Sequence, residues 1–311
     1  MNVVSLFDGI GCGAVALQRA EIDVDRYVAY EIDNSSIKVA TTNHPNIEEM
    51  GDVTKADFTQ YKGFDLVIGG SPCQGFSFAG KQLNFSDPRS KLFFEFVRAI
   101  KEIQPKYFLL ENVVMQKQYE DVITEYLGVE PILINSALVS AQNRRRLYWT
   151  NIPNVSQPKD LNIKLTDILE DVPINGIMYD KNSLNKATII GRRINEQGHR
   201  DDYNKSIPIS QCLEVRATNT DKSNCLTTVS KDNVLTPLNI GRHQDAYKNN
   251  LPFRYYTVKE YCRLQTLPDD YCDVIPSSIA MKAIGNGWTV DVIAHILKYI
   301  KQDKMNSTEE S

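Results

Sequence analysis

The chain has 311 residues, and its 35 lysines and arginines against 39 aspartates and glutamates give a formal net charge of -4. At about 150 residues per domain, this length predicts two domains, or one large and one small. No apolar run of about 18 residues is present, which excludes a transmembrane helix, and the N-terminus lacks the basic-then-apolar pattern of a signal peptide. The six cysteines form no Cys-x-x-Cys pair, which argues against structural zinc and redox pairs. We therefore expect a protein of the reducing cytoplasm.

Roughly the first 150 residues alternate short apolar strands with segments of helical periodicity. This alternation predicts βαβ units and a mainly parallel sheet of the α/β class. Strands are predicted, in chain order, over Val3–Leu6, Arg26–Glu31, Phe64–Gly69, Tyr107–Leu110, Pro131–Leu138 and Arg146–Ile152. Helices are predicted over Gly13–Ala20, Asn34–Thr42 and Leu92–Ile103.

The periodicity is lost from about Val155 to Asn250, where only Gln211–Ala217 and Asn224–Val229 are candidate strands. Lys181–Arg254 holds 12 lysines and arginines against 7 aspartates and glutamates, a net charge of +5, together with ten asparagines. A mildly basic, amide-rich segment suits contact with phosphates and base edges. The charge taken alone, however, favours the alternative that this segment is a solvated insertion without a role in binding.

Regular structure is predicted again towards the C-terminus. Thr257 and Glu260 form a capping-box pattern that opens a helix towards Leu264. One apolar helical face then predicts a helix over Thr289–Lys301. The polar end, Asp303–Ser311, is expected to be a disordered tail.

The unusual residues each follow the carboxyl end of a predicted strand. Gly9 and Gly11 follow the first strand, Glu31 ends the second, Cys73 follows the third and Glu111 the fourth. In open α/β sheets, ligands bind in the crevice beyond these strand ends. The motifs therefore predict one site assembled from several loops.

The first glycine pair points to a cofactor. Gly9, Gly11 and Ala14 fit the pattern G-x-G-x-x-G/A, and Glu31 lies 20 residues beyond Gly11. A carboxylate there can accept hydrogen bonds from ribose hydroxyls, which favours an adenosine-containing cofactor, either NAD or S-adenosylmethionine. Asp52 could accept a hydrogen bond from an adenine amino group, although alone it fits a turn aspartate, and the glycines alone fit a tight turn.

Three further positions point to covalent chemistry on a ring. Cys73, in Ser71-Pro72-Cys73-Gln74, can act as a nucleophile once it becomes a thiolate. Glu111, half-buried beside a thiolate, can stay protonated and donate to a ring nitrogen, because desolvation and a nearby negative charge both disfavour the ionised form. Arg144 and Arg146 share a face of an extended segment and supply cations, although three consecutive arginines alone indicate a solvated basic run.

Taken together, these residues resemble the DNA (cytosine-5)-methyltransferase family over roughly residues 2–152 and 255–300. The stretch Gly70–Gln82 is similar to bacterial and phage modification methyltransferases, whereas Leu92–Phe96 and Arg146–Trp149 also resemble the animal de novo DNA methyltransferases. Trp288 departs from the bacterial pattern, which has a small aliphatic residue there. The motifs stand in the family's order: Phe7-Asp8-Gly9-Ile10-Gly11, Glu31, Gly51-Asp52-Val53, Pro72-Cys73-Gln74, Glu111-Asn112-Val113, Gln142-x-Arg144-x-Arg146, Arg263-Leu264-Gln265 and Gly285-Asn286-Gly287.

The resemblance implies a Rossmann-like methyltransferase domain with a mixed, mainly parallel sheet, formed by residues 1–154 and 255–302. Residues 155–254 would form a smaller, irregular target-recognition domain, and residues 303–311 the tail. The implied activity is sequence-specific methylation of cytosine at carbon 5 in double-stranded DNA, after the base is flipped out of the duplex. S-adenosylmethionine would be the methyl donor, and no metal is implied.

The resemblance also implies roles for individual residues. Cys73 would add to carbon 6 of the cytosine, Glu111 would hydrogen-bond its N3, and Arg146, supported by Arg144, would contact its O2. The implied cofactor contacts are Phe7, Gly9, Gly11, Glu31, Ile32, Asp52, Val53, Pro72, Leu92, Asn286 and Trp288. The candidate DNA contacts are Gln74, Ser77, Lys81, Gln82, Arg192, Arg193 and Arg216, with the amides of Asn195, Gln197, Gln211 and Asn219 also able to pair with bases.

Three alternatives compete with this hypothesis. A family branch that methylates tRNA cytosine shares the site, but the Cys-Phe-Thr signature typical of it is absent. A non-catalytic cofactor-binding regulator would not need Cys73, Glu111 and Arg146 intact. An NAD oxidoreductase would leave Pro72-Cys73-Gln74 unexplained. We expect a monomer from a bacterium or phage, with a cognate restriction endonuclease in the same host as a partner in function that is not physically bound.

Overall fold

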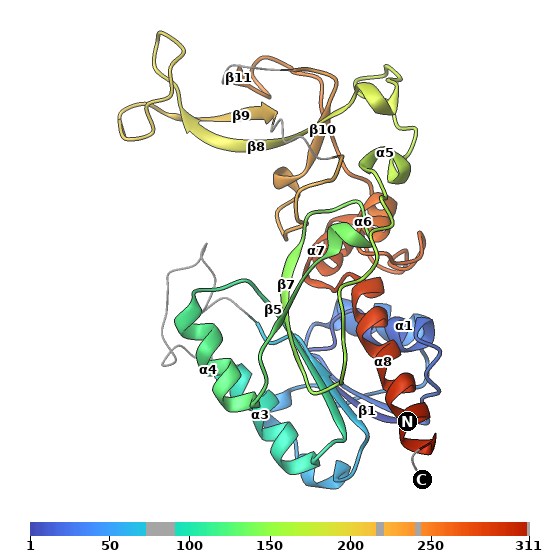
Figure 1. The fold of residues 1–311 in the computed structure, drawn as a ribbon. Helices are drawn as coiled ribbons and strands as arrows, with labels where there is room; N and C mark the ends of the chain where they lie inside the picture. The colour runs from blue at the N-terminus through green and yellow to red at the C-terminus, as the bar shows by residue number, and fades with distance from the viewer. Residues whose placement is uncertain (73–90, 216–220, 240–243, 310–311) are drawn as a thin grey trace.

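The computed structural model describes residues 1–72, 91–215, 221–239 and 244–309, the last six of these as backbone only. Within them, no helix combines the length and apolar character needed to cross a membrane. The fold has two parts, a large sheet flanked by helices and a smaller sheet stacked beyond one end of it (Figure 1).

The large sheet has seven strands in the order β3-β2-β1-β4-β5-β7-β6. Strands β1 to β5 pair in parallel, whereas β7 runs antiparallel to both β5 and β6. The predicted mixed, mainly parallel sheet is therefore confirmed. The strands are β1 (Asn2–Leu6), β2 (Arg26–Tyr30), β3 (Ile47–Glu49), β4 (Leu66–Gly69), β5 (Tyr107–Val113), β6 (Ile132–Asn135) and β7 (Arg145–Thr150).

Four strands end at other residues than expected. Strand β2 stops at Tyr30, so that Glu31 follows it, and β7 stops at Thr150. Strand β5 continues to Val113, so Glu111 lies within the strand and not after it, because antiparallel pairing with β7 extends the ladder there. Strand β6 stops at Asn135, whose side chain accepts a hydrogen bond from the N–H of Ala137 and so starts the 3-10 helix η3 (Ser136–Leu138).

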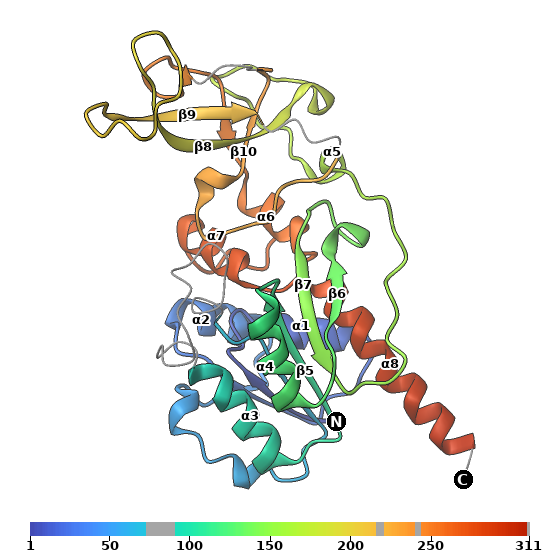
Figure 2. The same cartoon turned by 60° about the vertical axis from the view of Figure 1, so that its left-hand side comes forward.

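Both faces of the large sheet are covered by helices, as Figures 1 and 2 show. Because side chains alternate along a strand, Val4 packs with α3 and α4 on one face, while its neighbour Val3 packs with α1, α2 and α8 on the other. The helices are α1 (Cys12–Arg19), α2 (Asn34–Asn43), α3 (Lys91–Ile103), α4 (Lys117–Leu127), α5 (Leu165–Ile168), α6 (Val258–Leu264), α7 (Ser277–Asn286) and α8 (Val290–Glu309), and the other 3-10 helices are η1 (Val53–Lys55), η2 (Phe58–Tyr61), η4 (Lys181–Ser183) and η5 (Ser230–Asp232).

The C-terminal helix is longer than expected, and the prediction of a disordered tail from Asp303 onwards is wrong as far as Glu309. The Asp303 carboxylate accepts a hydrogen bond from the hydroxyl of Tyr107 and lies 3.3 Å from Nζ of Lys106. These contacts with the start of β5 hold the helix against the sheet beyond its apolar stripe.

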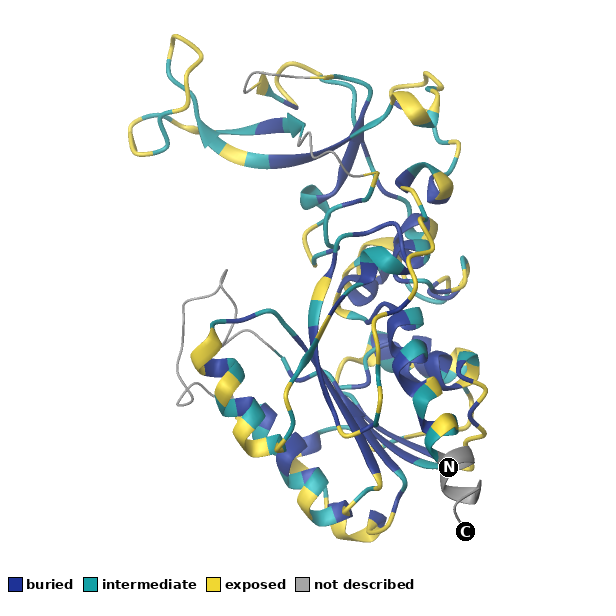
Figure 3. Cartoon of the chain, in the orientation of Figure 1, coloured by how far each residue is buried: buried dark blue, intermediate teal, exposed yellow. Residues whose placement is uncertain are grey.

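The smaller sheet is antiparallel, with five strands in the order β11-β9-β8-β10-β12. Strand β9 confirms the candidate strand near Gln211, but Asn224–Val229 lies in no strand. Figure 3 shows far fewer buried residues here than in the large sheet. The strands are β8 (Asn185–Arg193), β9 (Ile209–Val215), β10 (Val234–Thr236), β11 (Gln244–Asp245) and β12 (Arg254–Tyr255).

A buried ion pair joins the two parts. The guanidinium of Arg254, in β12, donates to both carboxylate oxygens of Glu260 at 2.7 and 2.8 Å, and Glu260 is fully buried. Glu260 also completes the predicted capping box with Thr257 at the start of α6. The core of the large sheet takes in Leu226 and Leu235 of the middle segment, so the expected boundary at residues 155–254 is crossed by apolar packing.

Candidate active site

The loop after β1 has an unusual backbone. Phe7, Gly9 and Gly11 have φ values of 57°, 62° and 80°, in the left-handed region. Gly11 is the N-cap of α1, so the first N–H groups of the helix face the carboxyl edge of the sheet. A Cβ placed on Gly9 would meet no heavy atom within 4 Å. The loop therefore borders open space at the end of β1.

Glu31 is fixed beside this loop. Its Oε2 accepts a hydrogen bond from the N–H of Gly9 at 2.9 Å, and its Oε1 accepts from Ile32 and Asp33 at 2.7 and 2.9 Å. Three backbone donors thus orient the carboxylate between the ends of β1 and β2. Ile32 is 74% exposed next to it, as a residue that covers a ligand would be.

The remaining predicted cofactor residues differ in how far they are buried. Asp52 accepts hydrogen bonds from the N–H and hydroxyl of Thr54, and Val53 is buried behind it. Leu92 lies half-buried on α3. Asn286 is exposed at the end of α7, and Pro72 is the last described residue before the gap at 73–90.

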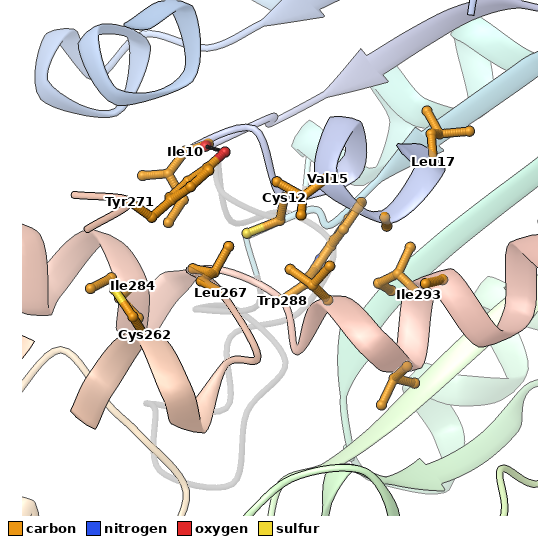
Figure 4. Close-up of a cluster of buried hydrophobic side chains, with 14 of the residues drawn as sticks. Ile10, Cys12, Val15, Leu17, Cys262, Leu267, Tyr271, Ile284, Trp288 and Ile293 are labelled. Atoms are coloured by element: carbon orange, nitrogen blue, oxygen red, sulfur yellow. Dashed lines mark hydrogen bonds between the residues drawn. The ribbon is translucent and has the colours of Figure 1, made fainter. Parts of the chain in front are cut away.

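Trp288 is part of the apolar core, and not only of a pocket lining. Its side chain packs with Cys12 and Val15 of α1 and with Ile293 of α8 (Figure 4). A Cβ on Gly70 would stand 2.9 Å from the indole Nε1 of Trp288 and 3.2 Å from Oε2 of Glu111. Glycine at position 70 therefore lets the chain leaving β4 pass close to both side chains.

An ion pair stands where β5 and β7 meet. Nε of Arg146 lies 2.9 Å from Oε1 of Glu111, and the two side chains are 14% and 12% exposed. The next residue, Asn112, donates to the backbone oxygen and hydroxyl of Ser71 at 3.4 and 3.2 Å. The end of β4 is thereby tied to the strand that carries Glu111.

Arg144 has a different environment from Arg146. It is buried, and it donates to the carbonyl oxygens of Leu226 at 3.1 Å and Gly287 at 2.9 Å, with longer bonds to Gly285. This burial lowers the pKa of Arg144. Its guanidinium thus joins β7 to the middle segment and to the loop between α7 and α8, which suits a structural support better than a contact with substrate.

The predicted arginines of the middle segment that the structure describes make their hydrogen bonds within the β8–β9 hairpin. Arg192 binds both carboxylate oxygens of Glu214, at 2.7 and 3.2 Å, and Arg193 donates to backbone oxygens of Ile207 and Asp202. Contacts between these arginines and bases would require breaking these bonds. Asn195 likewise accepts the N–H groups of Gln197 and His199, and Gln211 accepts from Lys231.

Several predicted residues lie outside the described part of the chain: Cys73, Gln74, Ser77, Lys81, Gln82, Arg216 and Asn219. Among the described residues, no group of three or more His, Cys, Asp or Glu side chains could hold a metal ion.

Two residues near the site were missed by the sequence analysis. Asp8 is buried between Ser5 and Tyr27, and burial raises its pKa to about 6 although their hydrogen bonds oppose the rise. Asp8 lies inside the glycine motif, so a charged residue at this place in the sequence could have marked it as part of the site. Cys225 contacts both Arg144 and Arg146, and no motif in the middle segment marks it.

An open, mostly parallel sheet with a glycine loop after its first central strand and a fixed carboxylate after the next defines a Rossmann-like enzyme with a nucleoside-containing cofactor. The Glu111–Arg146 pair, two strands away at the same edge, adds groups suited to a polar ring.

Comparison with known proteins identifies the family within this class. Residues 1–302 match the family described as C-5 cytosine-specific DNA methylase, and the chain belongs to it. Members transfer a methyl group from S-adenosylmethionine to carbon 5 of cytosine in DNA. The resemblance seen in the sequence is therefore confirmed.

The relatives include bacterial and phage enzymes. The type II methyltransferase M.Eco47II of Escherichia coli is 32% identical, over 98% of this chain and 80% of that protein. The orphan methyltransferase M.SPRI of Bacillus phage SPR is 36% identical, over 55% of this chain and 42% of that protein. The structure of the Entamoeba histolytica methyltransferase EhMeth superposes with a TM-score of 0.71 at 16% identity, covering 97% of this chain and 98% of that one, and this likeness shows the fold.

Proposed function

We propose that this protein methylates cytosine at carbon 5 within a specific sequence of duplex DNA, with Cys73 as nucleophile and with Glu111 and Arg146 binding the cytosine ring. The Glu111–Arg146 pair is the observation that carries the proposal. Its nitrogen and oxygen atoms are 2.9 Å apart and nearly buried, and Glu111 lies beside Gly70, two residues before Pro72.

Cys73, Glu111 and Arg146 have different roles in the proposed reaction. The Cys73 thiolate adds to carbon 6 of the flipped cytosine, and the electron pair released moves towards carbon 5 and the N3–C4 amidine. Glu111 hydrogen-bonds to N3, and Arg146 donates to O2, so that both stabilise the charge that develops on the ring. Loss of the carbon 5 proton to water and departure of the cysteine then restore the aromatic ring.

The carboxyl edge of the sheet fits S-adenosylmethionine. Glu31 is oriented by three N–H groups and can accept from ribose hydroxyls, and the space beside Gly9 allows close approach to the loop. Asp52 would accept a hydrogen bond from the adenine amino group, with Ile32 and Val53 on either side of the adenine. When bound, S-adenosylmethionine supplies the methyl group that carbon 5 receives.

The middle segment, residues 155–254, is proposed to recognise the target sequence. Its sheet stands beyond the carboxyl edge of the large sheet (Figure 1), and its net positive charge suits phosphate contacts. We further propose a monomer acting in the cytoplasm of a bacterium, encoded by the host or by a phage, with protection from a cognate endonuclease as its role.

Transfer of labelled methyl from S-adenosylmethionine tests the proposal. Mixed-sequence duplex DNA and total tRNA are the parallel substrates, and bisulfite sequencing locates the product. We expect label at cytosine in one fixed duplex context. Label confined to tRNA would favour the tRNA methyltransferase alternative. No label on either substrate, with cofactor binding retained, would favour a non-catalytic regulator.

A pair of cysteine variants tests the nucleophile. Cys73→Ser should lower kcat by about 10³-fold or more while leaving the Kd for S-adenosylmethionine within about twofold. Cys212→Ser, in β9, changes a cysteine of the smaller sheet and should leave kcat unchanged. Full activity in Cys73→Ser would exclude Cys73 as the nucleophile.

A further inference from the structure

The catalytic pair is in contact with a thiol from the middle segment. Sγ of Cys225 lies 3.8 Å from Nη2 of Arg146 and 3.5 Å from Nη1 of Arg144, within the range at which sulfur accepts a weak hydrogen bond. The sulfur therefore lies between two guanidinium groups of the proposed active site.

With this contact, each nitrogen of the Arg146 guanidinium has a partner. Nε of Arg146 faces Glu111 at 2.9 Å, Nη1 donates to the carbonyl of Arg145 at 2.9 Å, and Nη2 faces Cys225. Each of the three nitrogens thus has a different partner, which fixes the plane of the guanidinium as well as its position. Arg144 depends less on the thiol, because Leu226, Gly285 and Gly287 also accept from it.

Backbone bonds hold Cys225 in place. The N–H of Ser223 donates to Ala141 at 2.6 Å, and the N–H of Asn143 donates back to Ser223 at 2.9 Å. The N–H of Leu226 donates to the side chain of Gln142 at 3.2 Å, and Asn233 donates to the carbonyl of Cys225 at 3.3 Å. Residues 223–226, here called the bridging strip, therefore run beside 141–144 with little freedom to shift.

Helix α7 packs closely against the residue that follows the strip. A Cβ on Gly285 would stand 2.6 Å from the carbonyl oxygen of Thr227, so α7 packs against the backbone directly after the strip. The position of the thiol relative to Arg146 is consequently set by β7, α7 and the middle segment together.

We propose that Cys225 is a positioning residue, contributed by the middle segment, that holds the guanidinium of Arg146 in the orientation needed to pair with Glu111 and to contact the cytosine. The proposal rests on the function proposed above and assigns a role in it to a residue outside the family motifs.

Two substitutions at Cys225 and one matched control separate positioning from general stability. Cys225→Ala removes the acceptor, and we expect kcat to fall about 10-fold, the loss of one charge-assisted hydrogen bond, with the KM for DNA and the Kd for S-adenosylmethionine within about twofold. Cys225→Ser restores an acceptor and should recover kcat to within about threefold of the wild type. Cys212→Ala truncates a fully buried cysteine of the same segment, so it should change Tm without changing kcat.

A readout independent of activity is the ¹⁵N spectrum of the Arg146 guanidinium, assigned with Arg146→Lys. Separate, slowly exchanging Nη signals are expected in the wild type and in Cys212→Ala, and averaged signals in Cys225→Ala. Averaged Nη signals in Cys225→Ala would support the positioning role whether or not the wild type methylates DNA. A wild type that methylates no DNA would contradict the proposed function and leave this readout unaffected. Unchanged signals together with wild-type kcat in Cys225→Ala would overturn the proposal.

Discussion

At the scale of single residues, the carboxyl edge of the large sheet gathers acidic side chains. Glu49 ends β3, and both of its carboxylate oxygens are buried without a hydrogen-bond partner among the described residues. Burial, with added repulsion from Asp8 and Glu31, raises the pKa of Glu49 from 4.5 to about 7. The protein without cofactor therefore holds an ionised Glu49 at neutral pH only against an electrostatic cost.

Replacing Glu49 by glutamine should stabilise the protein at high pH. As pH rises from 4.5 to about 7, the unfolded chain releases this proton first, so the wild-type free energy of unfolding falls across that window and the loss is complete above it. Since the side chain is only half-buried, solvent screening reduces the effect to about 1–2 kcal/mol. Urea unfolding at pH 8.5 should show this gain in Glu49→Gln, and unfolding near pH 4.5 should show almost none.

The neighbouring residue is a matched control. Glu48 pairs with Arg26 at 2.7 Å, a partner that lowers the pKa of Glu48, so Glu48→Gln should bring no gain at pH 8.5. Equal gains in both variants would mean that net charge, and not the burial of Glu49, sets the effect.

At the scale of elements, buried polar side chains connect segments that also share one apolar core. Arg144 connects the start of β7 to the bridging strip and to the α7–α8 loop through backbone carbonyls. Gln265 does the same for α6, donating to Ile284 and Gly287 at 3.0 and 2.9 Å. Buried donors of this kind are costly to remove, because their acceptors are left without partners.

Arg144→Met should therefore lower the free energy of unfolding by about 3 kcal/mol. Arg145, exposed and adjacent in sequence, provides the comparison, and Arg145→Met should change stability by less than about 0.5 kcal/mol. Chemical denaturation of both variants measures the difference. A small loss in Arg144→Met would show that water can replace the guanidinium at these carbonyls.

In the β8–β9 hairpin, Arg192→Met should weaken the fold but not the electrostatic part of DNA binding. Arg192 is bound to Glu214 and is 14% exposed, so its loss should lower Tm, whereas Arg200, half-exposed and paired with Asp202, should matter less. The dependence of log Kd on log salt should keep its slope, because losing one phosphate contact changes that slope by about one. A slope reduced by about one would place Arg192 on the DNA backbone.

At the scale of the whole molecule, the smaller sheet has too little core to stand alone. Among the described residues, its own buried apolar cluster consists of Ala187, Ile189, Leu213, Val234 and Ala246, and these supply little hydrophobic stabilisation. Leu226 and Leu235 pack instead into the core of the large sheet, and the Arg254–Glu260 pair closes the junction.

We therefore expect both parts to unfold together. The two tryptophans, Trp149 and Trp288, are buried with the large sheet, and pulsed labelling of the Cys212 thiol reports on the smaller one. Urea midpoints from tryptophan fluorescence and from Cys212 labelling should coincide. Labelling of Cys212 at clearly lower urea would mean that the smaller sheet opens independently.

The sequence was sufficient to find strands β1, β2, β4 and β5 along the chain, because each is a short apolar run ending in a glycine or polar motif. It missed β3, whose three residues Ile47–Glu49 include two glutamates and so show no apolar run. It was sufficient too for the place of Glu31 beside Gly9, which follows from neighbouring parallel strands. It failed at the middle segment, whose strands bury one thin face and so lack a clear pattern. The roles of Arg144 and Cys225 depend on backbone carbonyls and contacts from distant segments, which no local pattern encodes.

The packing of α8 against α1 has a consequence for synthesis of the chain. The core that α8 completes buries Val15, Ala16 and Leu17 of α1 together with Ala20, the C-cap of α1. Helix α8, however, begins only at Val290. At about 5–20 residues per second, the ribosome delivers α8 roughly 15 to 50 s after α1. Throughout that interval the apolar side of α1 lacks its final cover, so the nascent chain offers chaperones a hydrophobic surface that the finished protein conceals.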